Sequence, residues 1–352
     1  MNRRSFQSLA LAASVSRIAG AADNATAAPR IKAAQIGTKH AHAAAQFEAL
    51  RGCPDFEVVG LHEPDEEQRR KVEKQAAYSG VTWLTEEQLF NTPGLQIVAV
   101  ETEIGSLLHH AERVANAGLH LHLDKPAGES LPQFKRILDT LTGHKRLLKM
   151  GYMFRFNPAF QVTFQAAKEG WLGKLFYIRG EMSKKISASD YDVLRPYKGG
   201  SMFELGCHVI DSAVWLLGKP SKVTSFARSF SNDGFNDNMV AMLEYPDALV
   251  QIRVALMEPD GGTRRQFVVC GNHGSCEVRP LEKPAMKITL EKPQGKFRKG
   301  TQDVPITDVP RHVADWAAFA KAVRGETEWS WKPEHDLAVQ ETVLLASGLP
   351  IA

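Results

Sequence analysis

Hydrophobic and polar residues follow two different patterns along the chain, and the change between them divides it in two. From residue 31 to about 150, short apolar runs alternate with longer stretches in which apolar residues recur every three or four positions. Short apolar runs are typical of buried strands, and the longer stretches of amphipathic helices. The repeated strand–helix order predicts a doubly wound parallel sheet covered by helices on both faces. The expected strands are 31–37, 56–64, 95–102, 119–126 and 146–156, and the expected helices are 42–52, 66–80, 106–118 and 130–143.

From about residue 158 the pattern becomes rich in strands at hairpin spacing, flanked by a few helices. It predicts a mostly antiparallel open sheet in an α+β domain. The expected strands are 222–230, 238–246, 248–256, 265–271, 275–281 and 286–291, and the expected helices are 158–170, 208–218, 313–325 and 333–348. The fold class is therefore α/β. Residues 1–29 form a leader, 30–152 a nucleotide-binding domain and 153–352 a substrate and oligomerisation domain, whose C-terminal helices can pack back on the first domain.

The N-terminus has a different composition. Arg3 and Arg4 are followed by a mildly apolar run, and the small residues "ATAA" at 25–28 offer a cleavage site. This pattern resembles a twin-arginine export signal and predicts an exported or periplasmic protein; the alternative is a disordered basic tail. Arg17 interrupts the apolar run, which is too short to cross a membrane, so no membrane partner is expected.

Charge adds little to this picture. The formal net charge is +3 over 352 residues, and we see no basic stripe. A nucleic-acid partner would require clustered Lys and Arg side chains, so none is expected.

The first turn, "AQIGTKHAHAAA", lies where a dinucleotide-binding fold carries three glycines. Gly37 is present, whereas Lys39 and His42 occupy the other two positions. A lysine and a helix N-terminus can still attract a pyrophosphate, so Lys39 and His40 are predicted to replace contacts made by the glycine backbone. Glu63 ends the second strand, where an acid accepts hydrogen bonds from the adenine ribose, and this favours NAD over NADP. The alternative is that Glu63 only begins a turn.

Three later segments carry a family resemblance. They are "AGLHLHLDKPAGES" at 117–130, "GYMFRFNPAF" at 151–160 and "GGSMFELGCHVIDSAVWLLGKP" at 199–220. In this order they resemble the glucose-fructose oxidoreductase / inositol 2-dehydrogenase (Gfo/Idh/MocA) family. The resemblance implies a Rossmann domain that binds NAD tightly, a carbohydrate substrate, and a possible homo-oligomer formed through the C-terminal sheet.

The resemblance also implies roles for single residues. Lys125 matches the motif lysine that touches substrate and nicotinamide, next to Pro126, which often follows a cis bond. Glu204 and His208 match an acid–histidine pair at helical spacing, with His208 as the catalytic base. The implied cofactor contacts further include Thr102 and Asp124.

The candidate substrate residues come from the same segments and are Tyr152, Arg155, Asn157 and Asp211. Arg155 has a structural alternative, in which it fixes the linker between the domains. The sequence departs from the family pattern at the glycine turn, at Glu103 and Leu107, and at Asp124, where the family has glutamate.

Histidines cluster near the expected sheet edge. His40 and His42 lie in the first turn, and His120 and His122 alternate with Asp124 along one strand. A zinc-like site would need three or four such ligands within bonding distance. We expect no metal here and retain the metal site as an alternative.

Three functions remain open from the sequence. The first is an NAD-dependent dehydrogenase acting on a hydroxyl of a sugar, cyclitol or glycoside. The second is a redox-neutral glycosidase or lyase that works through a 3-keto intermediate and keeps its NAD. The third is a non-catalytic relative that binds a carbohydrate or a partner protein.

Overall fold

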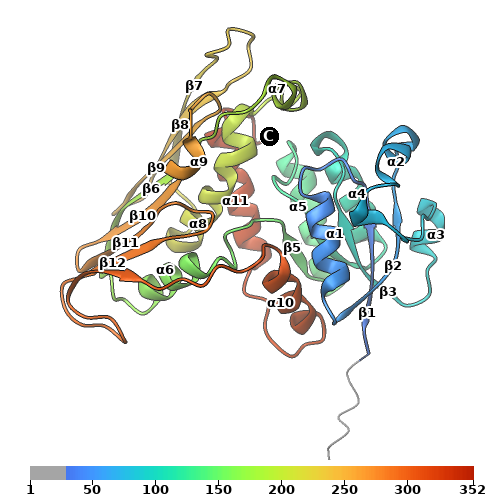
Figure 1. Cartoon of the computed structure of the whole chain (residues 1–352), viewed down its shortest axis with the longest axis horizontal. Helices are drawn as coiled ribbons and strands as arrows, with labels where there is room; N and C mark the ends of the chain where they lie inside the picture. The colour runs from blue at the N-terminus through green and yellow to red at the C-terminus, as the bar shows by residue number, and fades with distance from the viewer. Residues whose placement is uncertain (1–28) are drawn as a thin grey trace, which may run out of the picture.

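The computed structural model describes residues 29–352, which form two sheets with helices between them (Figure 1). The predicted export signal falls almost entirely outside the described residues. Within residues 29–352, no helix is both long and apolar enough to cross a membrane. The two sheets lie on either side of the predicted boundary between residues 152 and 153.

The first sheet is parallel throughout and has the strand order β2-β1-β3-β4-β5. Its strands β3 and β4 are almost completely buried, as expected for a sheet covered on both faces. Its strands are β1 (Ile31–Ile36), β2 (Phe56–His62), β3 (Leu95–Val100), β4 (His120–Leu123) and β5 (Leu148–Met150), and its main helices are α1 (Ala43–Gly52), α4 (Ile104–Asn116) and α5 (Leu131–Gly143).

The second sheet is mixed and has the order β13-β12-β11-β10-β6-β9-β8-β7, in which only the β6–β9 pair is parallel. Figure 1 shows α8 and α11 on the side of this sheet that faces the first domain. The predicted fold class is confirmed. The strands are β6 (Leu175–Glu181), β7 (Lys222–Arg228), β8 (Asn238–Glu244), β9 (Leu249–Ala255), β10 (Gln266–Gly271), β11 (Gly274–Val278), β12 (Met286–Leu290) and β13 (Gly300–Val304); the main helices are α6 (Pro158–Lys168), α8 (Cys207–Leu217) and α11 (Pro333–Ala346).

The C-terminal region returns to the first domain through α10 (Val313–Val323), which packs against α1. The Trp316 indole N–H donates to the Gln46 side chain at 3.0 Å, and its ring packs edge-on against Phe56 at 5.4 Å. The Trp329 indole donates to the Leu148 carbonyl at 2.8 Å. The C-terminal residues therefore complete the packing of the first domain.

Two element predictions were too long. The helix expected at 66–80 ends as α2 (Glu66–Val72), and a 3-10 turn at Ala76–Tyr78 then places the Tyr78 ring against Phe47. The strand expected at 146–156 stops after Met150, because the chain turns at Gly151 directly against Asp124. The sequence analysis missed strand β6. It also missed four short elements with weak patterns: α3 (Glu86–Phe90), α7 (Ala188–Leu194), α9 (Gly261–Arg264) and strand β13.

Gly37 supplies a test of the first turn. Its φ is +86°, and a Cβ there would lie 2.5 Å from the Thr102 methyl carbon and 2.7 Å from its backbone nitrogen. We expect Gly37→Ala to lower the free energy of unfolding by at least about 1–3 kcal/mol, measured by urea denaturation. Gly105→Ala is the matched control: nothing lies near its Cβ, so it should be neutral or stabilising by up to about 1 kcal/mol. Equal stability of the two variants would contradict this explanation.

The buried side chain of His120 should make the free energy of unfolding depend on pH. Its Nδ1 accepts the Leu147 backbone N–H at 3.0 Å, and burial, with Arg146 adding to it, lowers its pKa to about 4. Below the unfolded pKa of about 6.5 the unfolded chain takes up a proton that the fold does not, so stability falls as pH drops from 6.5 towards 4. Replacing His120 with Gln should remove about 2 kcal/mol of the loss between pH 7 and pH 5. Urea denaturation at both pH values measures this; an unchanged difference would contradict it.

Candidate active site

Lys125 connects the two domains. It follows β4, its bond to Pro126 is cis as the resemblance implied, and its side chain is 1% exposed. The Lys125 Nζ donates to the carboxylate and to the backbone carbonyl of Glu204, both at 3.0 Å. Burial alone would lower the pKa of Lys125, but Glu204 raises it above its ordinary value, so the lysine stays charged. Burial would likewise raise the pKa of Glu204, but Lys125 and His40 lower it, so the pair is ionised.

His208 lies at the same domain junction, near the start of α8. Its ring is 6.2 Å from Tyr152 and 6.1 Å from His42, and its Nδ1 has no hydrogen-bond partner. Burial, followed by the charge of Lys125, lowers the pKa of His208 well below its ordinary value. His208 is therefore neutral and can accept a proton.

Glu204 lies in a π-helical turn, Met202–Gly206, rather than in the α-helix that the spacing suggested. Its link to His208 thus does not follow from α-helical geometry. The two residues are connected instead through Lys125, which is hydrogen-bonded to Glu204 and whose charge lowers the pKa of His208. The structure brings the three predicted catalytic residues together.

The predicted cofactor residues in and around the first turn include one partly exposed side chain, Lys39, and two buried ones, Glu63 and Thr102. Lys39 forms ion pairs with Asp65 at 2.7 Å and with Glu103 at 3.9 Å, and its side chain is 32% exposed. Glu63 is buried and accepts from the Thr38 hydroxyl at 2.6 Å, while Thr102 is buried beneath Gly37.

Lys39 borders a cleft of about 660 Å³ between the N-terminal end of α4 and the segment around α7. This is the edge of a parallel sheet at which nucleotides bind in such folds. Other lining residues are Glu103, Ile104, Leu108, His109, Ser130 and Tyr197.

The first-turn histidines contact the end of β4. The His40 ring makes hydrogen-bond contact with the Lys125 carbonyl through Nε2, at 2.9 Å, and its Nδ1 lies 3.2 Å from Asp124 Oδ2. The His42 Nδ1 lies 3.2 Å from Asp124 Oδ1. Burial would raise the pKa of Asp124, but His40 and His42 keep it well below its ordinary range. Asp124 also accepts the Lys125 backbone N–H at 2.6 Å, so it orients the loop that carries the lysine.

Two predicted substrate residues, Arg155 and Asp211, lie in a buried ion network. Arg155 Nη2 donates to Asp211 at 2.7 Å and to Asp336 of α11 at 2.5 Å, and its guanidinium lies 4.4 Å from the centre of the Trp331 ring. Asp211 also contacts His335 at 3.1 Å. These contacts agree with the structural alternative for Arg155, which fixes the interdomain linker to both α8 and α11. A contact with substrate is left as a prediction.

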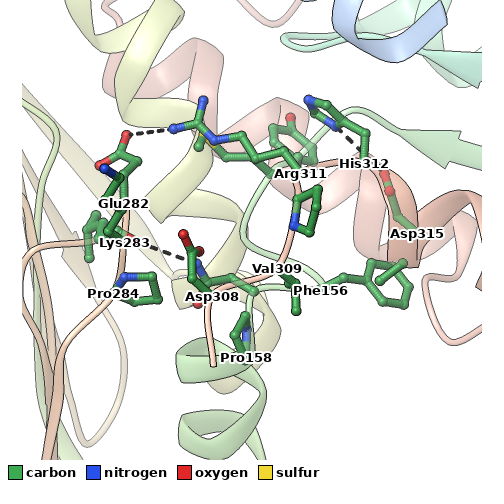
Figure 2. Close-up of a pocket in the computed structure, with 16 residues that line it drawn as sticks. Phe156, Pro158, Glu282, Lys283, Pro284, Asp308, Val309, Arg311, His312 and Asp315 are labelled. Atoms are coloured by element: carbon green, nitrogen blue, oxygen red, sulfur yellow. Dashed lines mark hydrogen bonds and ion pairs between the residues drawn. The ribbon is translucent and has the colours of Figure 1, made fainter. Parts of the chain in front are cut away.

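The other two predicted substrate residues, Tyr152 and Asn157, line a cavity of about 310 Å³ (Figure 2). Asn157 also caps α6 through its side-chain oxygen. The segment 308–312 passes along this cavity, and in Figure 2 Arg311 extends towards Glu282. His312 lines the cavity, and its ring is 5.8 Å from His42, so the cavity adjoins the histidine cluster.

Several residues of this region were not predicted as site residues. Glu101 is completely buried and contacts His122 at 2.9 Å, and His312 and Asp336 come from the C-terminal segment. Glu101 immediately precedes Thr102 at a strand end, a position that could have identified it. Nothing in the local sequence shows that His312 and Asp336 return to the site.

Family comparisons cover most of the chain. A profile described as "Oxidoreductase family, NAD-binding Rossmann fold" matches residues 31–152, and one described as "GFO/IDH/MocA C-terminal domain" matches 160–277. The oxidoreductase YhhX of Escherichia coli is 28% identical over 58% of this chain and 59% of its own length. The D-xylose 1-dehydrogenase (NADP(+)) 2 of Haloferax volcanii is 26% identical over 62% of this chain and 68% of its own length.

Solved structures share the fold over almost the whole chain. The aldose-aldose oxidoreductase of Caulobacter crescentus, solved with glycerol, has a TM-score of 0.75 and 18% identity, covering 91% of this chain and 98% of its own. GenD2 from gentamicin A biosynthesis, solved with NAD, has a TM-score of 0.74 and 21% identity, covering 91% and 93%.

The structural role of Arg155 can be tested by substitution. Replacing it with Met leaves Asp211 and Asp336 buried without a cation, and we expect about 3–5 kcal/mol lower stability in urea denaturation. The control is Arg195→Met: that side chain is 53% exposed and pairs with Asp192, so the loss should stay within about 1 kcal/mol. A stable Arg155→Met protein with only a raised KM would instead support substrate binding.

Proposed function

The chain belongs to the Gfo/Idh/MocA family of oxidoreductases, and on that premise we propose that it oxidises a hydroxyl of a sugar, cyclitol or glycoside with NAD. The observation that carries the proposal is the junction of Lys125, Glu204 and His208. A buried ammonium ion and a neutral histidine lie near each other there: the histidine can accept a proton from an alcohol, and the ammonium ion can stabilise the negative charge left on the oxygen.

The residues at the sheet edge fit a nicotinamide dinucleotide. The cleft beside Lys39 is of ligand size, and Lys39 offers a partly exposed cation near the N-terminal end of α4. Glu63 and Asp65 place carboxylates at the end of β2, where a 2′-phosphate would be repelled, and this supports NAD over NADP. When bound, the nicotinamide supplies the hydride acceptor.

The side chains at the junction have separate tasks. Neutral His208 accepts the proton of the substrate hydroxyl. The Lys125 ammonium stabilises the negative charge that develops on that oxygen, and Glu204 holds the ammonium in place. Burial raises the pKa of Tyr152 well above its ordinary value, so its phenol stays protonated and can donate a hydrogen bond.

The cavity of Figure 2 supports a hydroxyl-rich substrate. Its lining combines charged and amide groups with the aromatic ring of Phe156, the mixture that suits a sugar ring. Tyr152 belongs both to this cavity and to the surroundings of His208. The polar lining residues are Asn157, Glu282, Lys283, Asp308 and Arg311.

The twin-arginine-like start favours a second candidate, a redox-neutral glycosidase or lyase acting through a 3-keto intermediate in the periplasm. Such an enzyme recovers its hydride in each cycle and needs no external nicotinamide pool, which agrees with tightly bound NAD. Cleavage of a nitrophenyl glycoside without any added acceptor would distinguish it from a net dehydrogenase.

The second sheet supports a proposed homo-oligomer. Large apolar side chains on three of its strands are about half exposed, and a second copy of the sheet could cover them. They are Phe176 at 51%, Phe226 at 56% and Leu249 at 49%.

Substitution of His208, together with an assay for bound NAD, tests the proposed chemistry. The purified protein should release NAD on denaturation, and it should reduce its cofactor with at least one member of a panel of sugars, cyclitols and glycosides. His208→Gln should lower kcat by about 10²–10⁴-fold with its NAD content unchanged. His273→Gln, at a 49% exposed surface histidine, is the control and should keep full activity.

Two results would contradict the proposal. Full turnover by His208→Gln would exclude His208 as the base. Absence of NAD, together with no reduction of added NAD across the panel, would support the non-catalytic alternative.

A further inference from the structure

Three oxygen and nitrogen acceptors converge beneath the first turn. His40 Nδ1 lies 3.2 Å from Asp124 Oδ2 and 3.6 Å from Glu101 Oε2. Both carboxylates are completely buried, and these two oxygens have no hydrogen-bond partner. An unpartnered buried carboxylate oxygen is costly, so either a bound cation or a shared proton must satisfy these two.

The hydrogen bonds around His40 indicate which ring nitrogen carries the proton. His40 Nε2 is 2.9 Å from the Lys125 carbonyl, which can only accept, so Nε2 carries the proton. In the neutral ring His40 Nδ1 then has a single lone pair, which the His42 backbone N–H approaches at 3.2 Å and which a metal ion would take in place of that hydrogen bond. This nitrogen lies beside two carboxylate oxygens, so a metal ion or a shared proton is needed to balance the group.

The spacing of the side chains fits a metal ion. One ligand atom from each of His40, His42 and Asp124 lies within 4.8 Å of the others, and each histidine Nδ1 lies 3.2 Å from an Asp124 oxygen. Ligands at about 2.0–2.1 Å from a tetrahedral zinc ion are about 3.3 Å apart. We infer that His40, His42 and Asp124 bind one zinc ion, with Glu101 as a further carboxylate next to it. The inference rests on this geometry and does not depend on the proposed function.

A second cluster, with one histidine and two aspartates, shows why this one is distinctive. Asp211, His335 and Asp336 also come close enough to hold an ion. There the Arg155 guanidinium already lies against both carboxylates, so their charge is balanced. The two lysines near His40 form ion pairs with other carboxylates and so do not balance Asp124 and Glu101: the Lys125 Nζ pairs with Glu204, and the Lys149 Nζ pairs with Asp315 at 2.8 Å.

Two imidazoles and one carboxylate form the ligand set of catalytic zinc sites, which leave a position open for water or substrate. His42 is the most exposed of the three ligands, with 21% of its side chain accessible, and its ring lies near those of His208 and His312. A zinc ion here would hold a hydroxyl or carbonyl oxygen of a carbohydrate as a Lewis acid, beside His208.

The test is zinc binding by the full chain, purified without a histidine tag and stripped with a chelator. Calorimetric titration with ZnCl₂ should give about one ion per chain, with release of protons that makes the heat depend on the buffer. Cobalt in place of zinc should give the visible absorption of a tetrahedral site. His42→Ala should abolish this binding, and Glu101→Gln should weaken it by about 10–100-fold.

His335→Ala is the matched control from the cluster that Arg155 neutralises, and it should bind zinc as the unmodified chain does. Circular dichroism of each variant checks that it is folded, and His42 is exposed enough for its replacement to be tolerated. Failure of the stripped, folded chain to take up zinc would overturn the inference, and so would unchanged binding by His42→Ala. In either case a shared proton would balance the two carboxylates.

Discussion

The arrangement of the site depends on one buried ion pair across the domain junction. Lys125 comes from the end of a strand in the first domain, and Glu204 from the helical segment of the second. A buried ammonium ion is costly unless it is paired and fully hydrogen-bonded, and Glu204 supplies both a carboxylate and a carbonyl. The pair therefore requires the two domains to meet at this point. His208 follows Glu204 by one turn and is brought to the junction with it.

The same rule applies to the other buried charges. Arg155 in the linker is bonded to Asp211 and Asp336, and Lys149 of β5 pairs with Asp315 and lies 4.2 Å from the centre of the Trp316 ring. Each network joins segments that are far apart in the sequence. Charge pairing therefore helps to position one domain against the other, together with an apolar core that runs through both.

The apolar runs of most strands were regular enough to predict both sheets, although β6, in the middle of the second sheet, was missed. The resemblance also named Lys125, Glu204 and His208 from separate short motifs, and the fold brings them to one junction; their catalytic roles stay a prediction. The sequence did not predict the partners of Arg155. Asp336 lies on a helix with an unremarkable pattern, and only tertiary structure shows that α11 packs beside the linker. The extent of the π-turn at Met202–Gly206 could not be predicted either, since residue type alone does not distinguish it from an α-turn.

Helix α10 has a consequence for how this chain folds. Trp316 packs edge-on against Phe56 and donates a hydrogen bond to Gln46. Part of the packing of the nucleotide-binding domain is therefore supplied by a residue about 270 positions further along the chain. Contacts at such long sequence separation slow folding, because a long loop must close before they form. A ribosome-bound chain that ends before α10 therefore exposes an apolar face of its first half. The order of synthesis places the last packing step of the first domain at the end of translation.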